Sequence, residues 1–224
     1  KDIVEREIKE TEDLIIRITS RDNGYIQLID HGKISEIASE INCLLVFEER
    51  IGSFVSDSTV IFTLYLNENT EYKEDYTEKL LETLTIGMGK SEIQDFSFAI
   101  QKIVEIALRA ISPGVNDPNT ANHCLKIIGI LLGKIAELKD GYIIFKENDN
   151  KEGKAIFRTI SFEKEIYYTL YQIVHYGKSD ISVMLSMLQG LLFTIEKSRI
   201  ENQKAIVSFV DYTWNKIIAH VQNS

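Results

Sequence analysis

Two groups of polar side chains in this 224-residue chain are of types that could hold a polar ligand or move a proton. The first group is Gln94 with Asp95, and the second is Arg109 with Asn116 and Asp117. A guanidinium, amides and carboxylates supply hydrogen-bond donors and acceptors, and carboxylates can also act as acids or bases. We therefore take these five as candidate binding residues, but the sequence indicates no complete catalytic set.

The spacing of the two groups limits what they can do together. Asp95 and Arg109 are 14 positions apart in one predicted helix, or about 21 Å at 1.5 Å per residue. They cannot share one ligand directly unless that helix breaks. Arg109 can also pair with Glu105 one turn earlier, which is an ordinary structural role. Asn116 has the weakest structural explanation, beyond tolerating a left-handed turn.

Local capping explains most of the other candidates without chemistry. Ser91 and Gln94 have the spacing of a capping box, which predicts a helix with Ser91 as its N-cap. Asp117 followed by Pro118 is typical of an N-cap and the first helical position. The chain has only two prolines, and both lie in the segment 112–118. We therefore interpret 112–118 chiefly as a joint between two long helices.

No metal or cofactor site is indicated. The histidines have no HxxxH or HxH spacing and the cysteines no CxxC spacing, which are the usual signs of metal ligands. Those residues are His31, His123, His175, His220, Cys43 and Cys124. GxSxG, Walker A and GxGxxG motifs are absent from the sequence as well. We therefore expect no cofactor and no metal.

Composition and charge set the class of protein. With 44% hydrophobic and 26% charged residues, the chain is expected to be globular and soluble, not disordered. Its net charge of −9 argues against nucleic-acid binding, which relies on clustered lysine and arginine. No apolar run approaches the roughly 20 residues of a membrane span. Because the chain starts with Lys1, we expect a fragment of a longer protein.

The pattern along the chain predicts an α+β fold, with a small, barrel-like, β-rich N-terminal subdomain docked on a mostly helical one. Residues 1–13 hold six acidic and three basic residues, which is typical of a linker or helix from an upstream region. The β-rich subdomain is expected over 14–66 and the helical one over 67–224, with a β-hairpin near 142–160. Further expected elements are strands at 14–19, 25–30, 43–47 and 60–66, and helices at 33–40, 72–85, 91–112, 118–138, 166–175, 181–195 and 206–221.

Four stretches resemble the signature of a known family. Residues 87–121 read GMGKSEIQDFSFAIQKIVEIALRAISPGVNDPNTA, and shorter stretches are GYIQLID at 24–30, RIGSFV at 50–55 and YGKSD at 176–180. They resemble a bacterial family of predicted integral-membrane proteins known as domain of unknown function 2254. The resemblance covers about residues 20–200. Lys90 stands where that family has arginine, and lysine cannot form the paired hydrogen bonds that a guanidinium forms.

The resemblance implies transmembrane helices before residue 1 and a soluble domain after them, but no established function. We expect a non-catalytic regulatory, ligand-sensing or assembly domain of a membrane protein, on the cytoplasmic side of the cell membrane. Its expected partners are its own upstream helices, an unknown small ligand and a second copy of the chain, because helical domains with a Leu- and Met-rich face often pair. The alternative is a membrane-anchored hydrolase or transferase that uses Arg109, Asn116 and Asp117, with Asp30 from the β-rich subdomain.

Overall fold

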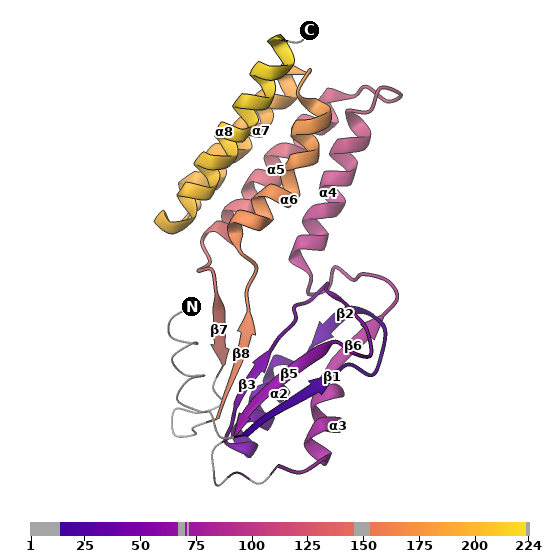
Figure 1. The fold of residues 1–224 in the computed structure, drawn as a ribbon. Coiled ribbons are helices and arrows are strands. Elements are labelled where there is room, and N and C mark those ends of the chain that lie inside the picture. The colour runs from indigo at the N-terminus through magenta and orange to yellow at the C-terminus, as the bar shows by residue number, and fades with distance from the viewer. Residues whose placement is uncertain (1–13, 67–69, 71, 146–152, 223–224) are drawn as a thin grey trace. The chain divides into compact units, whose positions relative to one another are not determined.

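The computed structural model describes residues 14–66, 70, 72–145 and 153–222. Within these residues it has seven helices and eight strands, with the strands mostly N-terminal and the helices mostly C-terminal (Figure 1). The chain folds as two compact units: unit 1 is Lys1–Phe96 with Gly141–Thr159, and unit 2 is Ser97–Asp140 with Ile160–Ser224. The predicted α+β class is confirmed. The linker expected at 1–13 lies outside the described residues.

Unit 1 contains two sheets. The larger has the order β1 (Leu14–Thr19), β5 (Val60–Leu66), β3 (Leu44–Phe47), β8 (Lys154–Arg158) and β7 (Tyr142–Phe145). Its neighbouring strands are antiparallel except β3 and β8, which are parallel. The smaller sheet has the order β4 (Phe54–Val55), β2 (Gly24–Ile29) and β6 (Leu84–Gly87), all antiparallel.

Helix α2 (His31–Ile41) forms where the sequence predicted a helix between two strands. Its apolar residues recur at helical spacing, and Ile34, Ile37 and Ile41 are buried in the core of unit 1. The Asp30 side chain caps the helix by accepting a hydrogen bond from the Lys33 backbone N–H at 3.0 Å. Asp30 therefore has a structural role here.

The β-hairpin belongs to unit 1, not to the helical part in which the sequence analysis put it. β7 and β8 pair in antiparallel register, and β8 then continues the larger sheet by pairing with β3. The boundary therefore differs from the one expected after residue 66, because residues 141–159 return to the N-terminal sheet. Parallel pairing of such distant segments leaves no local mark in the sequence.

Two predicted helices differ from those observed. Instead of one helix over 72–85, the chain forms the short helix α3 (Asp75–Leu81) and then strand β6. The predicted helix start at residue 91 is also wrong, because α4 (Phe96–Ala110) begins five residues later. Ser91 and Gln94 do not form a capping box. Gln94 instead bonds to strand β2, which holds residues 91–95 out of the helix.

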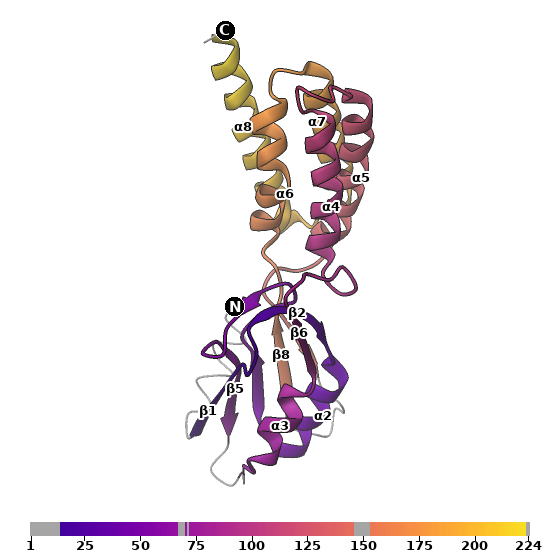
Figure 2. The same cartoon turned by 90° about the vertical axis from the view of Figure 1, so that its right-hand side faces the viewer.

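Unit 2 is a bundle of five helices within the described residues (Figure 2). After α4 come α5 (Pro118–Ala136), α6 (Phe162–Gly177), α7 (Ile181–Lys197) and α8 (Ile200–Gln222). Their apolar stripes meet in one core, as the periodicity predicted. None of the helices among the described residues has both the length and the apolar character needed to cross a bilayer.

Helices α5 and α7 run parallel and in close contact. Asn122 is hydrogen-bonded to Ser182 near the start of the pair, and Gly129 lies against Gly190 farther along. The hydroxyl of buried Thr194 donates to the carbonyl oxygens of both glycines at 3.0 Å. Because the helices are parallel, both N-termini lie at the same end of the bundle.

Candidate functional site

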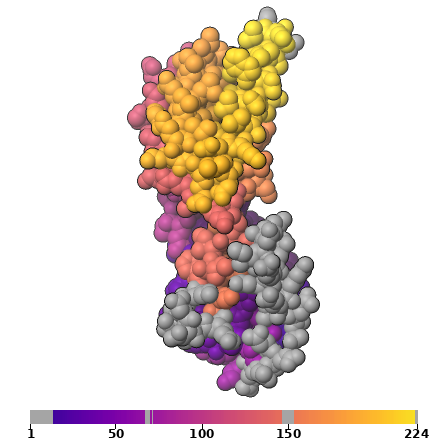
Figure 3. Space-filling view, turned by 90° about the vertical axis from the view of Figure 1, so that its left-hand side faces the viewer, coloured from indigo at the N-terminus to yellow at the C-terminus, as the bar shows by residue number. Residues whose placement is uncertain are grey.

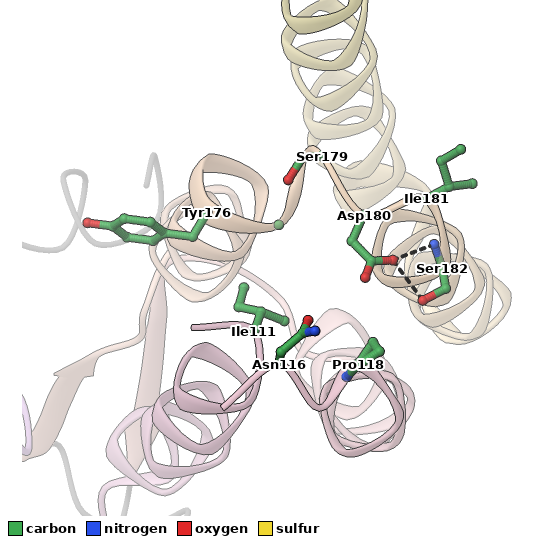
Figure 4. A pocket seen from close by; sticks show the side chains of 9 residues that line it. Ile111, Asn116, Pro118, Tyr176, Ser179, Asp180, Ile181 and Ser182 are labelled. Atoms are coloured by element: carbon green, nitrogen blue, oxygen red, sulfur yellow. Dashed lines mark hydrogen bonds between the residues drawn. The ribbon is translucent and has the colours of Figure 1, made fainter. Parts of the chain in front are cut away.

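A polar cavity of about 440 Å³ opens at this end of unit 2. It lies where the turn between α4 and α5 approaches the turn between α6 and α7 (Figure 4). The lining residues come from these two turns and from the helix ends beside them: Ile111, Asn116, Pro118, Tyr176, Gly177, Ser179, Asp180, Ile181 and Ser182. The cavity therefore joins the segment 112–118 to the segment 176–180, about 60 positions later in the sequence.

One wall of the cavity is the turn between α4 and α5, which is held by backbone hydrogen bonds. The Asn116 backbone N–H donates to the Ser112 carbonyl at 2.9 Å, and that of Asp117 donates to the Ala110 carbonyl at 2.8 Å. Asn116 has a φ of +49°, a left-handed conformation that asparagine tolerates better than most residues. Its side-chain amide makes no hydrogen bond to any described residue and points to the space between the turns (Figure 4). The amide is therefore available to a ligand.

The opposite wall carries Asp180, the N-cap of α7. Its Oδ1 accepts hydrogen bonds from the Ser182 N–H at 2.8 Å, the Ser182 hydroxyl at 2.8 Å and the Val183 N–H at 3.1 Å. The Ser182 hydroxyl, followed by these backbone donors, lowers the pKa of Asp180 below its ordinary value of 3.8. The carboxylate is thus charged at neutral pH. Its Oδ2 accepts no bond from a described residue and faces the Asn116 side (Figure 4).

The paired helix starts add polar groups behind this wall. The Asn122 amide nitrogen is 3.4 Å from the Ser182 hydroxyl oxygen, which links α5 to α7. The Asn122 Oδ1 is buried and has no partner among the described residues. Because Asp117 and Asp180 cap the two helices, their carboxylates offset the positive ends of the helix dipoles. Among the residues that line the cavity, the charged side chain is the Asp180 carboxylate, so the wall carries a negative charge.

The second group of predicted site residues is only partly brought together. Asn116 lines the cavity, whereas Asp117 turns its carboxylate to the Thr120 N–H and hydroxyl, as the predicted N-cap. Arg109 is exposed, does not line the cavity and makes no side-chain bond to a described residue. Glu105, its suggested partner, pairs with Lys102 at 3.6 Å instead.

Gln94 and Asp95, the first group, belong to unit 1. The Gln94 Oε1 accepts from the Ile29 N–H at 2.9 Å, and its Nε2 donates to the Ile29 carbonyl at 3.3 Å. The buried Asp95 carboxylate lies against Gly52, which has a φ of +80° and leaves no room there for a Cβ. Both side chains therefore support the smaller sheet.

The other stretches that carry the family resemblance meet in the same sheet. Strand β2 holds 24–29, and β4 lies in 50–55. The Gln27 side chain donates to the Gly89 carbonyl at 2.7 Å, and Lys90 lies 5.3 Å from the Tyr25 ring centre. In unit 1, the stretches that resemble the family therefore contact one another at the smaller sheet, which is a structural role.

Sequence reasoning missed Asp180 and Ser179 as site residues. The available signal was the YGKSD stretch at 176–180, since Asp180 precedes an apolar helix as an N-cap does. The described residues that line the cavity include no histidine, lysine or cysteine, and the base beside Ser182 is the Asp180 carboxylate, which already accepts a hydrogen bond from the Ser182 hydroxyl as part of the helix cap. Across the described residues, no group of three or more acidic, histidine or cysteine side chains could hold a metal ion.

Comparison with known proteins agrees with the resemblance noted from the sequence. A family model described as "Predicted membrane protein (DUF2254)" matches residues 2–192. The uncharacterized proteins Rv1290c of Mycobacterium tuberculosis and Mb1321c of Mycobacterium bovis are each 25% identical over 173 residues. Those residues are 75% of this chain and 33% of each relative, so the chain spans about a third of the length of these relatives. No solved structure gives a significant match. Since the family model covers most of the sequence, the chain belongs to the DUF2254 family of predicted membrane proteins.

Proposed function

We propose that unit 2 is the ligand-sensing part of a membrane protein and that it binds a small polar molecule in the cavity at 112–118 and 176–182. One observation carries the proposal. Two stretches of the family resemblance, far apart in sequence, line one polar cavity, with the Asn116 amide and the Asp180 Oδ2 available in its walls. Its volume of about 440 Å³ is within the range of small-molecule sites, about 300–1,000 Å³.

The free groups define the chemistry of the ligand. The ionised Asp180 carboxylate favours a hydroxyl or ammonium donor and repels an anion. The Asn116 amide can both donate and accept, and the Ser179 hydroxyl can do the same. The ligand we propose is therefore a neutral or cationic molecule that carries hydroxyl or amino groups.

Binding in this place also suggests a regulatory role. A ligand that bonds to both Asn116 and Asp180 would tie the α4–α5 turn to the α6–α7 turn. The ends of four helices would then be held together more tightly than without ligand. Because the chain spans about a third of its relatives, we propose that the change is passed to membrane-spanning segments outside it.

The location on the cytoplasmic side is part of the same proposal. Cys43 and Cys124, the chain's two cysteines, are both free and buried. Free thiols are typical of a reducing compartment, and this supports the cytoplasmic side.

The alternative of a hydrolase or transferase is less favoured by the contacts. It requires Asp117 to act on a substrate, but the Asp117 carboxylate is bonded to Thr120. It also requires Arg109, which is not among the lining residues. Binding without reaction therefore fits the arrangement better.

The test is a titration of the ¹⁵N-labelled chain followed by NMR, with ethanolamine, glycerol and acetate as probes. We expect ethanolamine and glycerol to cause saturable shifts of the amide signals of residues 116 and 179–182, and acetate to cause none. Asn116→Ala and Asp180→Asn should each abolish the ethanolamine shifts. Asparagine is itself a good N-cap, so Asp180→Asn should still fold.

Asn119→Ala is the matched control, because Asn119 is an exposed asparagine in α5 that does not line the cavity. This variant should respond like the unaltered chain. A flat titration with both ethanolamine and glycerol would contradict the proposal. A response that persists in Asn116→Ala and Asp180→Asn would contradict it as well.

A further inference from the structure

Helices α7 and α8 expose several large apolar side chains, and both helices lie on the face of unit 2 that is turned to the viewer in Figure 3. On α8 the exposed apolar residues recur every seven positions, with exposed fractions from 52% to 83%: Ile200, Val207, Trp214 and Val221. On α7 the spacing is four, then seven, with exposed fractions from 55% to 77%: Ile181, Leu185 and Leu192. Seven positions are about two helical turns, so these residues form an apolar stripe along one side of each helix.

The two stripes meet at a groove between α7 and α8. Its volume is about 240 Å³ and its lining is entirely aliphatic: Leu188, Leu191, Leu192, Ile195, Ile206, Val207 and Val210. The groove shares Leu192 and Val207 with the two exposed stripes. We call this combined surface, the two stripes with the groove, the α7–α8 face.

The size of the α7–α8 face matches what a stable dimer buries. Burying one Val, Leu or Ile side chain removes roughly 60–120 Å² of apolar surface, so the seven stripe residues, which are 52–83% exposed, present on the order of 300–550 Å². Each partner of a standard protein interface buries about 800 Å², of which somewhat more than half is apolar. An exposed apolar patch of this size is at the upper end of what monomeric proteins show and often marks a binding surface. The area therefore favours a protein partner of matching size.

We propose that the α7–α8 face is the interface with a second copy of this chain, in which α8 packs antiparallel to α8 of the partner subunit. Charge at its edge supports this arrangement. Lys204 and Asp211 are exposed, lie on one edge of the α8 stripe and form no ion pair with a described residue. In an antiparallel pair with its two-fold axis beside Val207, the two α8 helices run in opposite directions and the same edge of each lies on the same side of the dimer. Residues equally far before and after the axis then face each other. Lys204 then faces Asp211 of the partner subunit.

Of the residues of the α7–α8 face, only Ile181 also lines the polar cavity. The residues substituted in the test do not line it, so this inference and the proposed ligand site can fail separately. Sedimentation equilibrium of the 224-residue chain tests it. We expect a dimer whose dissociation constant rises at least tenfold in Val207→Lys. The control is Ile106→Lys on α4, since Ile106 has nearly the same exposed fraction as Val207, 53% against 52%. The control should dimerise normally, and far-UV circular dichroism should show both variants folded.

Charge reversal tests the antiparallel arrangement without altering the apolar surface. Lys204→Asp should raise the dissociation constant several-fold, because two exposed ion pairs per dimer become repulsive. Adding Asp211→Lys in the same chain should restore it to near its original value. A parallel dimer would show no such restoration, and that result would overturn the proposed arrangement.

Two other results would overturn the interface itself. One is a strictly monomeric chain at high concentration, or a dimer that Val207→Lys leaves unchanged. The other is a monomer that floats with phosphatidylcholine vesicles and loses this property in Val207→Lys, which would identify a lipid surface as the occupant.

Discussion

Gly129 of α5 and Gly190 of α7 lie so close together that a Cβ on Gly129 would overlap the backbone of Gly190. The Thr194 hydroxyl donates to the carbonyl oxygens of both residues at 3.0 Å. The close approach of the two helices therefore depends on the absence of a Cβ at both glycines and on the Thr194 hydroxyl, which bonds to both helices. Both N-termini that border the polar cavity depend on this crossing.

Gly129→Ala should destabilise unit 2. A helix normally gains up to about 1 kcal/mol from this substitution, but overpacking costs about 1–3 kcal/mol or more when backbone must move. We expect the cost of the clash to exceed the gain in helix propensity, so the urea midpoint of the variant should fall. Gly133→Ala, one turn later, is the control, because its Cβ would meet its nearest atoms at an ordinary 3.4 Å. That variant should be neutral or slightly more stable, and equal destabilisation by both would disprove the argument.

Gln94→Ala should destabilise unit 1 by about 1–3 kcal/mol, because the Ile29 N–H and carbonyl would lose their partner at a partly buried edge. Chemical denaturation followed by circular dichroism measures the loss. Glu92→Ala serves as the control, since Glu92 is exposed and its side chain has no hydrogen bond or ion pair with a described residue. It should change stability by less than about 0.5 kcal/mol. A Gln94→Ala variant as stable as this control would show that the bonds do not matter.

Asp117→Ala should lower the melting temperature, because the Thr120 N–H would lose its acceptor at the start of α5. Asp117→Asn should retain most of the stability, since asparagine caps helices about as well as aspartate. Differential scanning calorimetry of the two variants separates capping from charge. If both variants melted equally early, the charge and not the cap would be responsible.

Acid should destabilise unit 2 through Asp180. Hydrogen bonds from Ser182 and from backbone N–H groups lower the pKa of Asp180 below its ordinary value of 3.8 in the folded state. The folded state therefore binds this proton less readily than the unfolded state. The stabilisation is complete above pH 3.8 and is lost as the pH falls through the lower folded pKa.

Urea midpoints measured between pH 5 and pH 2.5 test this pH dependence. Asp180→Asn should lose less stability than the unaltered chain over that range, because it has no proton to bind. Parallel curves for the two proteins would mean that the carboxylate is not stabilised in the folded state.

Local features of the fold could be predicted from the sequence. Strands β1 and β5 occupy the predicted residues, and Asp117 is the predicted N-cap of α5. Helix periodicity and caps depend on side chains within a few positions of one another, so the sequence shows them directly. For the same reason, Asn116 could be singled out as the polar residue of its turn with the weakest structural explanation.

Only the tertiary structure decided which distant segments meet. Strand β8 joins β3, Gln94 leaves its predicted capping box for Ile29, and Asp180 faces the same cavity as Asn116. Each of these contacts joins residues more than 60 positions apart. A nearby cap and a distant strand edge compete for the same side chain, and packing of the whole unit determines which bond forms. The sequence by itself determined most of the helices and the Asp117 cap, and the tertiary structure decided that two turns close on one polar cavity.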